Sequence, residues 1–173
     1  MRFKLDSKNS LYFQNLYPYR AYTISSKPYR AVLGIGGNIG DVRRRFNHLF
    51  YLLRGSSYID IIETSPILKN PPFGYLNQNF FYNSILLIKT SLKPKSLLRY
   101  ILRVERKFRR ERPFKDSPRT LDIDIIFYEN IRLNLRDLTI PHIAWRSRES
   151  VTIPLCSMRN LYIRSILKRE GVL

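Results

Sequence analysis

The spacing of apolar and polar positions divides the chain from residue 31 to residue 128 into alternating strands and helices. A short apolar run at residues 31–36 predicts a buried strand, and the next segment has the 3.6-residue period of an amphipathic helix. Asp41 is placed to begin that helix and Gly55 to end it. The apolar face of the helix consists of Val42, Phe46, Leu49 and Leu53.

Two further strands, a second helix and a last strand follow. The strands are predicted at residues 57–68 and 80–90, on either side of a Pro- and Gly-rich loop, and the last one at residues 118–128. Pro94 is typical of a helix start, and the apolar face of that helix is Leu97, Leu98, Ile101 and Phe108. The order βαββαβ predicts an α+β fold, a ferredoxin-like sandwich with one antiparallel sheet and helices on one face.

The two ends of the chain lie outside this pattern. Residues 1–30 are rich in Tyr, Lys and Arg and show no clear period. We therefore predict an N-terminal extension that either covers the domain or stays partly disordered. Residues 31–173 are predicted to form a single domain, in which residues 131–173 add peripheral turns and a C-terminal helix.

The charge of the chain narrows the range of partners. With 31 Lys and Arg against 13 Asp and Glu, the formal charge is +18. Such an excess indicates a polyanionic partner, which can be nucleic acid, an anionic membrane or a phosphate-rich small ligand. A generally basic proteome is the plainer alternative. No segment has the roughly 20 apolar residues that a membrane span needs, and the N-terminus lacks the apolar core of a secretory signal.

Cysteine and histidine are scarce. Cys156 is the only cysteine, so the chain cannot form an intrachain disulfide, which favours a reducing, cytoplasmic location. With His48 and His142 as the only histidines, a Cys/His metal site is excluded.

The last predicted strand, in the sequence PRTLDIDIIFY, contains two aspartates. Alternate residues of a strand point to one face, so Asp122 and Asp124 project side by side while Leu121, Ile123 and Ile125 point the other way. At a Cα separation of about 7 Å, the two charges repel by about 2 kcal/mol at an effective dielectric constant near 20. The pair therefore requires a positive partner, either a metal ion or arginine.

Positive charge is concentrated just before this strand. In residues 103–119, RVERKFRRERPFKDSPR, basic residues far outnumber acidic ones. A solvated helix face with Glu–Arg pairs explains such a run. Arginines on a loop beside paired carboxylates can equally bind a metal–polyphosphate, because Mg²⁺ prefers oxygen ligands and guanidinium groups bind phosphate oxygens. The residues alone leave both explanations open.

Four motifs together resemble the 6-hydroxymethyl-7,8-dihydropterin pyrophosphokinase family. They are GIGGN at residues 34–38, ERKFRRER at 105–112, PRTLDIDIIFY at 118–128 and LTIPH at 138–142, and the similarity extends from about Ala31 to Leu155. In that family, ATP gives its terminal pyrophosphoryl group to the hydroxymethyl oxygen of the pterin and releases AMP, a step of folate biosynthesis. The resemblance thus implies an ATP-dependent diphosphokinase, with no nucleic-acid or membrane partner, that we expect to be a monomer.

The resemblance also implies roles for single residues on the nucleotide side. Asp122 and Asp124 match the pair that holds two Mg²⁺ ions, and Arg110 and Arg119 match arginines that contact the phosphates. These four form the predicted catalytic set. Residues matching ATP-binding positions are Glu105, Arg110, Arg112, Lys115, Arg119, Ile125, Thr139, His142 and Arg148. Of these, Arg112 and Lys115 fall in a loop that closes over ATP, although Lys115, Asp116 and Ser117 replace the Arg-Trp-Gly that family members usually carry.

On the pterin side, the resemblance rests on residues 70–83, NPPFGYLNQNFFYN. Phe73 is expected to stack on one face of the ring, and Asn83 to bond its amide edge together with backbone groups near Asn70 and Pro71. Phe81 is expected to form a wall of the pocket.

The family often has a second stacking phenylalanine where this chain has Ser150. We therefore hypothesise that Trp145 covers the opposite face of the pterin. The alternative is that Trp145 anchors the C-terminal segment to the core.

An RNA-binding module is the main alternative function. The RNA-recognition fold has the same βαββαβ order, and a charge of +18 suits a phosphate backbone. That fold needs exposed aromatic residues on its central strands, however, and the strand AVLGIG has none. Paired aspartates would also repel phosphate in the absence of a metal.

Overall fold

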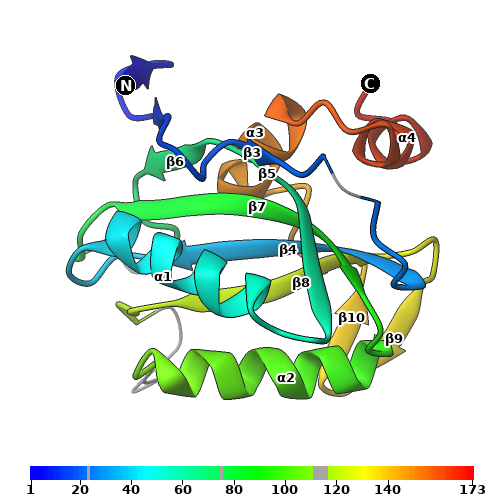
Figure 1. Cartoon of the computed structure of the whole chain (residues 1–173). Helices are drawn as coiled ribbons and strands as arrows, with labels where there is room; N and C mark the ends of the chain where they lie inside the picture. The colour runs from blue at the N-terminus through cyan, green and yellow to red at the C-terminus, as the bar shows by residue number, and fades with distance from the viewer. Residues whose placement is uncertain (23, 75, 111–116) are drawn as a thin grey trace.

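The computed structural model describes residues 1–22, 24–74, 76–110 and 117–173, and an antiparallel sheet forms its centre (Figure 1). The central strands are β4 (Tyr29–Gly37) and β7 (Phe81–Thr90). Strand β8 (Asp122–Tyr128) pairs with β4, and both β5 (Ile59–Thr64) and β6 (Ile67–Asn70) pair with β7. With helix α1 after β4 and helix α2 after β7, the predicted ferredoxin-like α+β fold is confirmed.

Helices α1 (Val42–Arg54) and α2 (Pro94–Lys107) cover one face of the sheet. The Asp41 side chain accepts a hydrogen bond from the Arg44 amide at the start of α1, as the pattern predicts. The apolar faces of both helices bury themselves against strand residues that point to this side. The main members of this first core are Leu33, Ile35, Phe46, Leu49, Phe50, Leu97, Ile101, Ile123 and Ile125.

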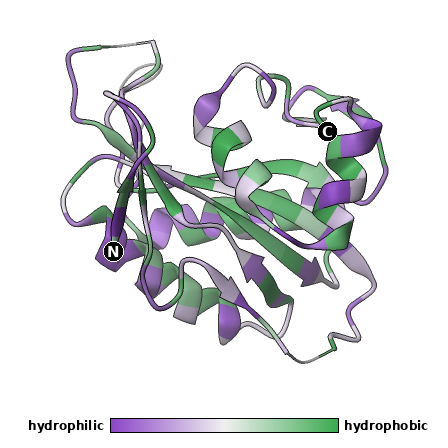
Figure 2. Ribbon diagram, turned by 90° about the horizontal axis from the view of Figure 1, so that it is seen from above, coloured by the Kyte–Doolittle hydropathy of each residue, from purple (hydrophilic) through white to green (hydrophobic). Residues whose placement is uncertain are grey.

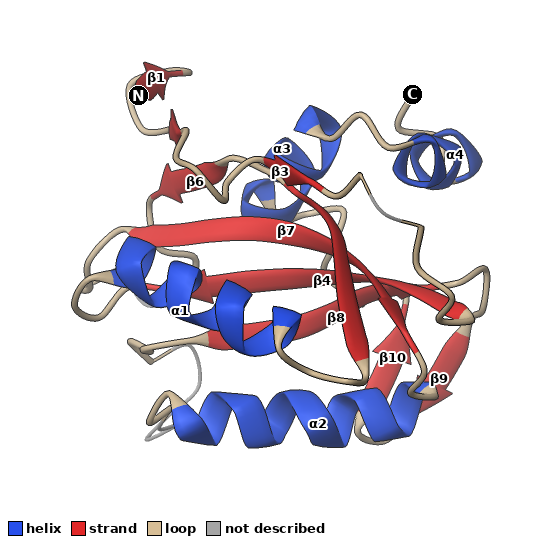
Figure 3. Cartoon of the chain, in the orientation of Figure 1, coloured by secondary structure: helices blue, strands red, loops and turns tan. Residues whose placement is uncertain are grey.

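The opposite face of the sheet is also covered, which the prediction of helices on one face did not include. Helices α3 (Glu149–Ser157) and α4 (Leu161–Arg169) pack there, after a hairpin of β9 (Leu133–Leu135) and β10 (Leu138–Ile140) (Figure 3). The reason lies in the central strands, where hydrophobic residues follow one another along the chain (Figure 2) and are buried in both clusters. Val32, Ile85, Leu87, Ile126 and Phe127 form this second core with α3 and α4.

The described residues of the N-terminal extension add short strands to the sheet. The extension contributes β1 (Arg2–Lys4), β2 (Ser10–Tyr12) and β3 (Tyr19–Arg20); β2 pairs with β6, and β3 with β5. Between these strands, Tyr17 is fully buried, and its hydroxyl donates a hydrogen bond of 2.9 Å to the carbonyl oxygen of Phe46 in α1. The extension therefore contributes a side chain to the first core.

None of the helices in the described part of the chain has the length and apolar character needed to cross a membrane.

Replacing Tyr17 with alanine is expected to lower the free energy of unfolding by about 3–5 kcal/mol, the usual cost of removing a fully buried large aromatic side chain. Tyr17→Phe should lower it by only about 1 kcal/mol, because it removes one hydrogen bond. Urea unfolding measures both effects. Tyr22→Ala is the matched control, since Tyr22 is 99% exposed. A loss at Tyr17→Ala no larger than at Tyr22→Ala would show that the extension does not support the core.

Candidate active site

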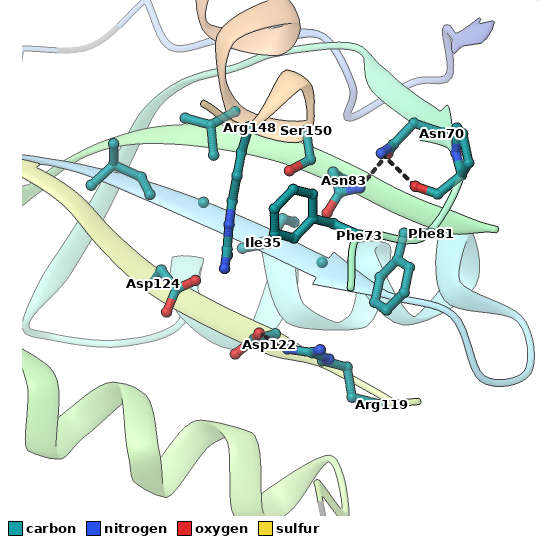
Figure 4. A pocket seen from close by; sticks show the side chains of 15 residues that line it. Ile35, Asn70, Phe73, Phe81, Asn83, Arg119, Asp122, Asp124, Arg148 and Ser150 are labelled. Atoms are coloured by element: carbon teal, nitrogen blue, oxygen red, sulfur yellow. Dashed lines mark hydrogen bonds and ion pairs between the residues drawn. The ribbon is translucent and has the colours of Figure 1, made fainter. Parts of the chain in front are cut away.

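One pocket brings together most of the predicted site residues (Figure 4). It is formed by β4, β7, β8, the loop after β6 and the start of α3. The predicted residues that line it are Asn70, Pro71, Phe73, Phe81, Asn83, Arg119, Asp122, Asp124 and Arg148. The rest of the lining was not predicted as site residues, although residues 34–36 and 126 belong to the recognised motifs: Gly34, Ile35, Gly36, Ile126, Ser150 and Val151.

The aspartates project from β8 toward the pocket, as strand alternation predicts, and arginine neutralises one of them. The Arg119 Nη1 donates to the Oδ2 atom of Asp122 over 2.6 Å. The Nη2 of Arg110 lies 2.5 Å from Oδ1 of Asp122, in a geometry that does not satisfy a hydrogen bond. Of the two positive partners that the sequence allowed, the structure places arginine beside Asp122.

Glu105 fixes Arg110 in this arrangement. Its Oε1 accepts hydrogen bonds from Arg110 Nη1 at 2.5 Å and from the Ile123 amide at 2.8 Å, and its side chain is buried at the end of α2. Burial raises the pKa of Glu105, while the charge of Arg110 acts to lower it. Glu105, predicted to bind ATP, thus links α2, Arg110 and the strand that carries the aspartates.

Asp124 has a less favourable environment. Burial raises its pKa, and the charge of Asp122 raises it further, whereas the charges of His142, Arg148 and Arg110 lower it. Figure 4 shows the Arg148 side chain extending across the pocket toward the aspartates. A carboxylate that is costly to ionise, beside a second one, is suited to binding an added cation.

The two carboxylates fit Mg²⁺, which prefers oxygen ligands and keeps positions for water and phosphate. Both carboxylate oxygens of Asp122 lie beside arginine, Oδ1 2.5 Å from Arg110 Nη2 and Oδ2 2.6 Å from Arg119 Nη1, so a cation bound there would share the carboxylate with these guanidinium groups. Among the described residues, Cys, His, Asp and Glu side chains form no cluster of three or more that could hold a metal. The remaining ligands of a bound ion would therefore have to come from a substrate or water.

In the absence of divalent cations, Asp124→Asn is expected to raise the free energy of unfolding at pH 7. The native state holds the pKa of Asp124 above its ordinary value of 3.8, so stability linked to this group is complete below that pH and is lost as the pH rises through the native pKa. Because asparagine does not ionise, the variant does not lose this stability as the pH rises. The difference in the free energy of unfolding between variant and wild type should therefore disappear near pH 3.8. Urea unfolding across pH 3.5–7 tests this, with the exposed Asp137→Asn as control. An equal stability of variant and wild type at pH 7 would contradict it.

The opposite side of the pocket is suited to a flat polar ligand. Asn83 Nδ2 donates to Asn70 Oδ1 over 2.7 Å, and Asn70 Nδ2 donates to the Pro71 carbonyl over 3.0 Å. These bonds orient the two amides. A Cβ atom at Gly36 would lie 2.6 Å from Asn83 Oδ1, so a side chain there would displace the Asn83 amide from this arrangement. Phe73 is 67% exposed at the pocket mouth, which leaves its ring available for stacking.

Arginine side chains meet the two predicted aromatic residues. The Arg148 guanidinium carbon lies 5.7 Å from the centre of the Phe73 ring, and that of Arg119 lies 5.3 Å from the Phe81 ring. Phe81 thus lines the pocket between Arg119, on the aspartate side, and Asn83. The sequence predicted Phe81 as a wall of the pocket.

Asn38, at the end of GIGGN, is a residue that the sequence reasoning missed. Its side-chain Oδ1 accepts a hydrogen bond from the Arg119 backbone amide over 2.8 Å, and its backbone amide donates to the Arg119 carbonyl over 3.0 Å. A Cβ at Gly37 would lie 2.5 Å from the Thr120 carbonyl oxygen, so this close approach requires glycine. The motif therefore holds the segment that carries Arg119. The available signal in the sequence was an asparagine directly after two glycines, and the structure shows that this asparagine is buried.

Trp145 does not line the pocket. Its side chain is 4% exposed in the second core, where it packs edge-on against Phe127 with ring centres 5.0 Å apart. This placement matches the alternative that Trp145 anchors the C-terminal segment, because the apolar second face of β8 needs cover. Ser150 and Arg148 border the pocket there.

The other predicted nucleotide residues lie outside the pocket lining. The Ile125 side chain belongs to the first core, on the face of β8 away from the aspartates. Thr139 Oγ1 donates to Asn134 Oδ1 over 3.4 Å in the β9–β10 hairpin, and the His142 amide donates to the Ile126 carbonyl over 2.9 Å. Arg112 and Lys115 lie outside the described residues.

Comparisons with known proteins agree with the motifs. A family model described as 7,8-dihydro-6-hydroxymethylpterin-pyrophosphokinase (HPPK) matches residues 32–160. The chain is 42% identical over 135 residues to the 2-amino-4-hydroxy-6-hydroxymethyldihydropteridine pyrophosphokinase of Helicobacter pylori, covering 77% of this chain and 83% of that protein. For the enzyme of the same name from Campylobacter jejuni, the identity is 37% over 139 residues, with 80% and 88% covered.

A longer protein shows the same similarity. The folic acid synthesis protein FOL1 of Dictyostelium discoideum is 33% identical over 135 residues, which cover 78% of this chain and 20% of that protein. The family model covers most of this chain, and the similarity spans most of each bacterial relative. The chain therefore belongs to the 7,8-dihydro-6-hydroxymethylpterin-pyrophosphokinase family.

Proposed function

We propose that this protein transfers the pyrophosphoryl group of ATP to the hydroxymethyl group of 6-hydroxymethyl-7,8-dihydropterin in folate biosynthesis. The observation that carries the proposal is the pocket itself. It places Asp122, Asp124 and Arg119 on one side and Phe73 and Asn83 on the other, within one chain of this family.

In this reaction the hydroxymethyl oxygen attacks the β-phosphorus of ATP. The bond between that phosphorus and the oxygen bridging to the α-phosphate breaks, AMP leaves with this oxygen, and the hydroxymethyl proton is released. We assign no covalent nucleophile to the protein, so the transfer is direct. The residues of the protein act by binding and orienting the two substrates.

We assign the aspartates to two Mg²⁺ ions, which when bound would supply positive charge to the phosphate oxygens. Arg110 and Arg119, already within 2.6 Å of Asp122, are positioned to bind phosphate oxygens at the same place. Asn83 and Asn70 would bond the amide edge of the pterin, and Phe73 would stack on its face. We assign Arg148, which lies between Phe73 and Asp124, to the nucleotide phosphates.

We further propose that the protein acts as a monomer in the cytoplasm. The described residues of a single chain supply both the aspartate side and the Phe73 side of the pocket, and a lone cysteine suits a reducing compartment.

Incubation with ATP, Mg²⁺ and the hydroxymethyl pterin tests the function. We expect AMP and the pterin diphosphate in equal amounts, measured by chromatography. ADP formation would instead indicate transfer of a single phosphoryl group. Absence of any pterin product would reject the proposed substrate.

The RNA-binding alternative has no support from the comparisons. The RNA-recognition fold binds bases on an open sheet face, whereas α3 and α4 bury Val32, Ile85 and Leu87 on that face here.

A further inference from the structure

The N-terminal extension contacts one wall of the acceptor side of the pocket. Strand β2 pairs with β6 in antiparallel register, with Ser10 opposite Lys69 and Leu11 opposite Leu68. Leu11 and Leu68 are both buried. The last residue of β6, directly after Lys69, is Asn70. Its side chain accepts a hydrogen bond from Asn83, and the loop that carries Phe73 begins after it. The extension therefore supports the strand from which this wall begins.

The extension also contacts a second part of the pocket lining, the start of α3, through Asn9. The side-chain Nδ2 of Asn9 donates a 3.3 Å hydrogen bond to Oε2 of Glu149, the first residue of α3. Glu149 lies between Arg148 and Ser150, and both of these residues line the pocket. Asn9 precedes β2 directly, so one short segment contacts both β6 and the start of α3.

A tight turn fixes the orientation of Asn9. Oδ1 of Asp6 accepts from the amides of Lys8 and Asn9 at 2.6 and 2.7 Å, and Oδ2 accepts from Asn9 Nδ2 at 2.9 Å. The Asn9 amide nitrogen thus lies between two carboxylates, Asp6 and Glu149. Both are acceptors, so the NH₂ group and not the oxygen must face them. Asn9 is 5% exposed, and its rotamer is held on both sides.

We propose that the N-terminal extension positions the acceptor side of the pocket and that Asn9 is the positioning residue that links its β6 wall to the start of α3. This inference rests on the proposed function, because it assigns the pterin to this part of the pocket. Among the described residues, Asp122, Arg110 and Arg119 form no hydrogen bond or ion pair with residues 6–12, whereas Arg148, which is also assigned to the phosphates, directly precedes Glu149. Loss of the Asn9 bonds should therefore weaken pterin binding more than ATP binding, which it can affect only through Arg148.

The decisive variant is Asn9→Ala. We expect the KM for the pterin to rise by about 3- to 10-fold, while the KM for ATP and kcat change by less than about twofold. Asn9→Asp should raise the pterin KM further, because a third carboxylate would then face Asp6 and Glu149. Glu149→Gln keeps an acceptor oxygen and should behave like wild type, whereas Glu149→Ala should resemble Asn9→Ala. Lys4→Ala, on exposed β1, is the matched control.

Hydrogen exchange gives a readout that does not depend on activity. The amides of Val151 and Thr152 both donate to the Arg148 carbonyl, at 2.9 and 3.0 Å, and report on the start of α3. They should exchange faster in Asn9→Ala than in Lys4→Ala. A wild-type pterin KM and unchanged exchange in Asn9→Ala would overturn the positioning role, as would equal rises in both KM values. An inactive wild-type protein would overturn the proposed function, and with it the acceptor assignment.

Discussion

Replacing Asp124 with alanine is expected to lower turnover by about two to three orders of magnitude, the usual effect of removing a group that stabilises transition-state charge. Asp124 lines the pocket beside Asp122, and burial raises its pKa, so the fold keeps a carboxylate there at some cost. The fold should remain intact, because the change removes a repulsion. Steady-state rates of AMP formation at saturating Mg²⁺ measure the effect.

Asp137→Ala is the control for this prediction, because Asp137 is an exposed aspartate in the β9–β10 turn. It should retain the wild-type rate. If Asp124→Ala also kept a near-normal rate at saturating Mg²⁺, the paired aspartates would be structural and the proposed metal site would be wrong.

Replacing Arg110 with alanine should damage both stability and catalysis. The Arg110 side chain is 6% exposed and lies 2.5 Å from Glu105 and 2.5 Å from Asp122. Removing one partner of a buried ion pair leaves its charge uncompensated and typically costs about 3–5 kcal/mol. We expect a loss of this size in urea unfolding. Arg106→Ala, on the exposed face of α2, should be near neutral.

A double variant separates the two effects. Arg110→Met with Glu105→Gln removes both opposite charges from the buried pair, so most of the lost stability should return. Turnover should stay low, because the guanidinium group that we assign to the phosphates is still missing. Recovery of turnover together with stability would show that Arg110 acts only through the fold.

The hydrophobic pattern was sufficient to predict the central helices and strands, because their buried residues recur with the helical period or alternate along a strand. Val42, Phe46 and Leu49 recur with the helical period and do pack on the sheet, and Asp122 and Asp124 share a strand face as alternation requires. The same reasoning missed the second helical layer. In a run such as Ser84–Ile88, polar and apolar residues do not alternate, so the sequence does not show whether one or both faces of the strand are covered. In addition, α3 has little amphipathic character of its own.

Features that depend on distant contacts could not be predicted. Asn38 holds Arg119 across 81 residues, and Tyr17 bonds Phe46 across 29 residues. Neither pairing leaves a periodic signal in the chain. The placement of Trp145 depended on whether the second face of β8 was covered, which the local sequence does not reveal.

The burial of Tyr17 bears on where the chain can be cut. A fragment limited to residues 32–160, the part that matches the family model, would lose Tyr17 from one side of the sheet and α4 from the other. Phe46 and Phe50 would lose a packing partner on the first face, and Val32 and Phe127 would lose cover on the second. Exposed apolar surface on two faces favours self-association. Such a fragment is therefore expected to aggregate, so a soluble preparation should keep both flanking segments.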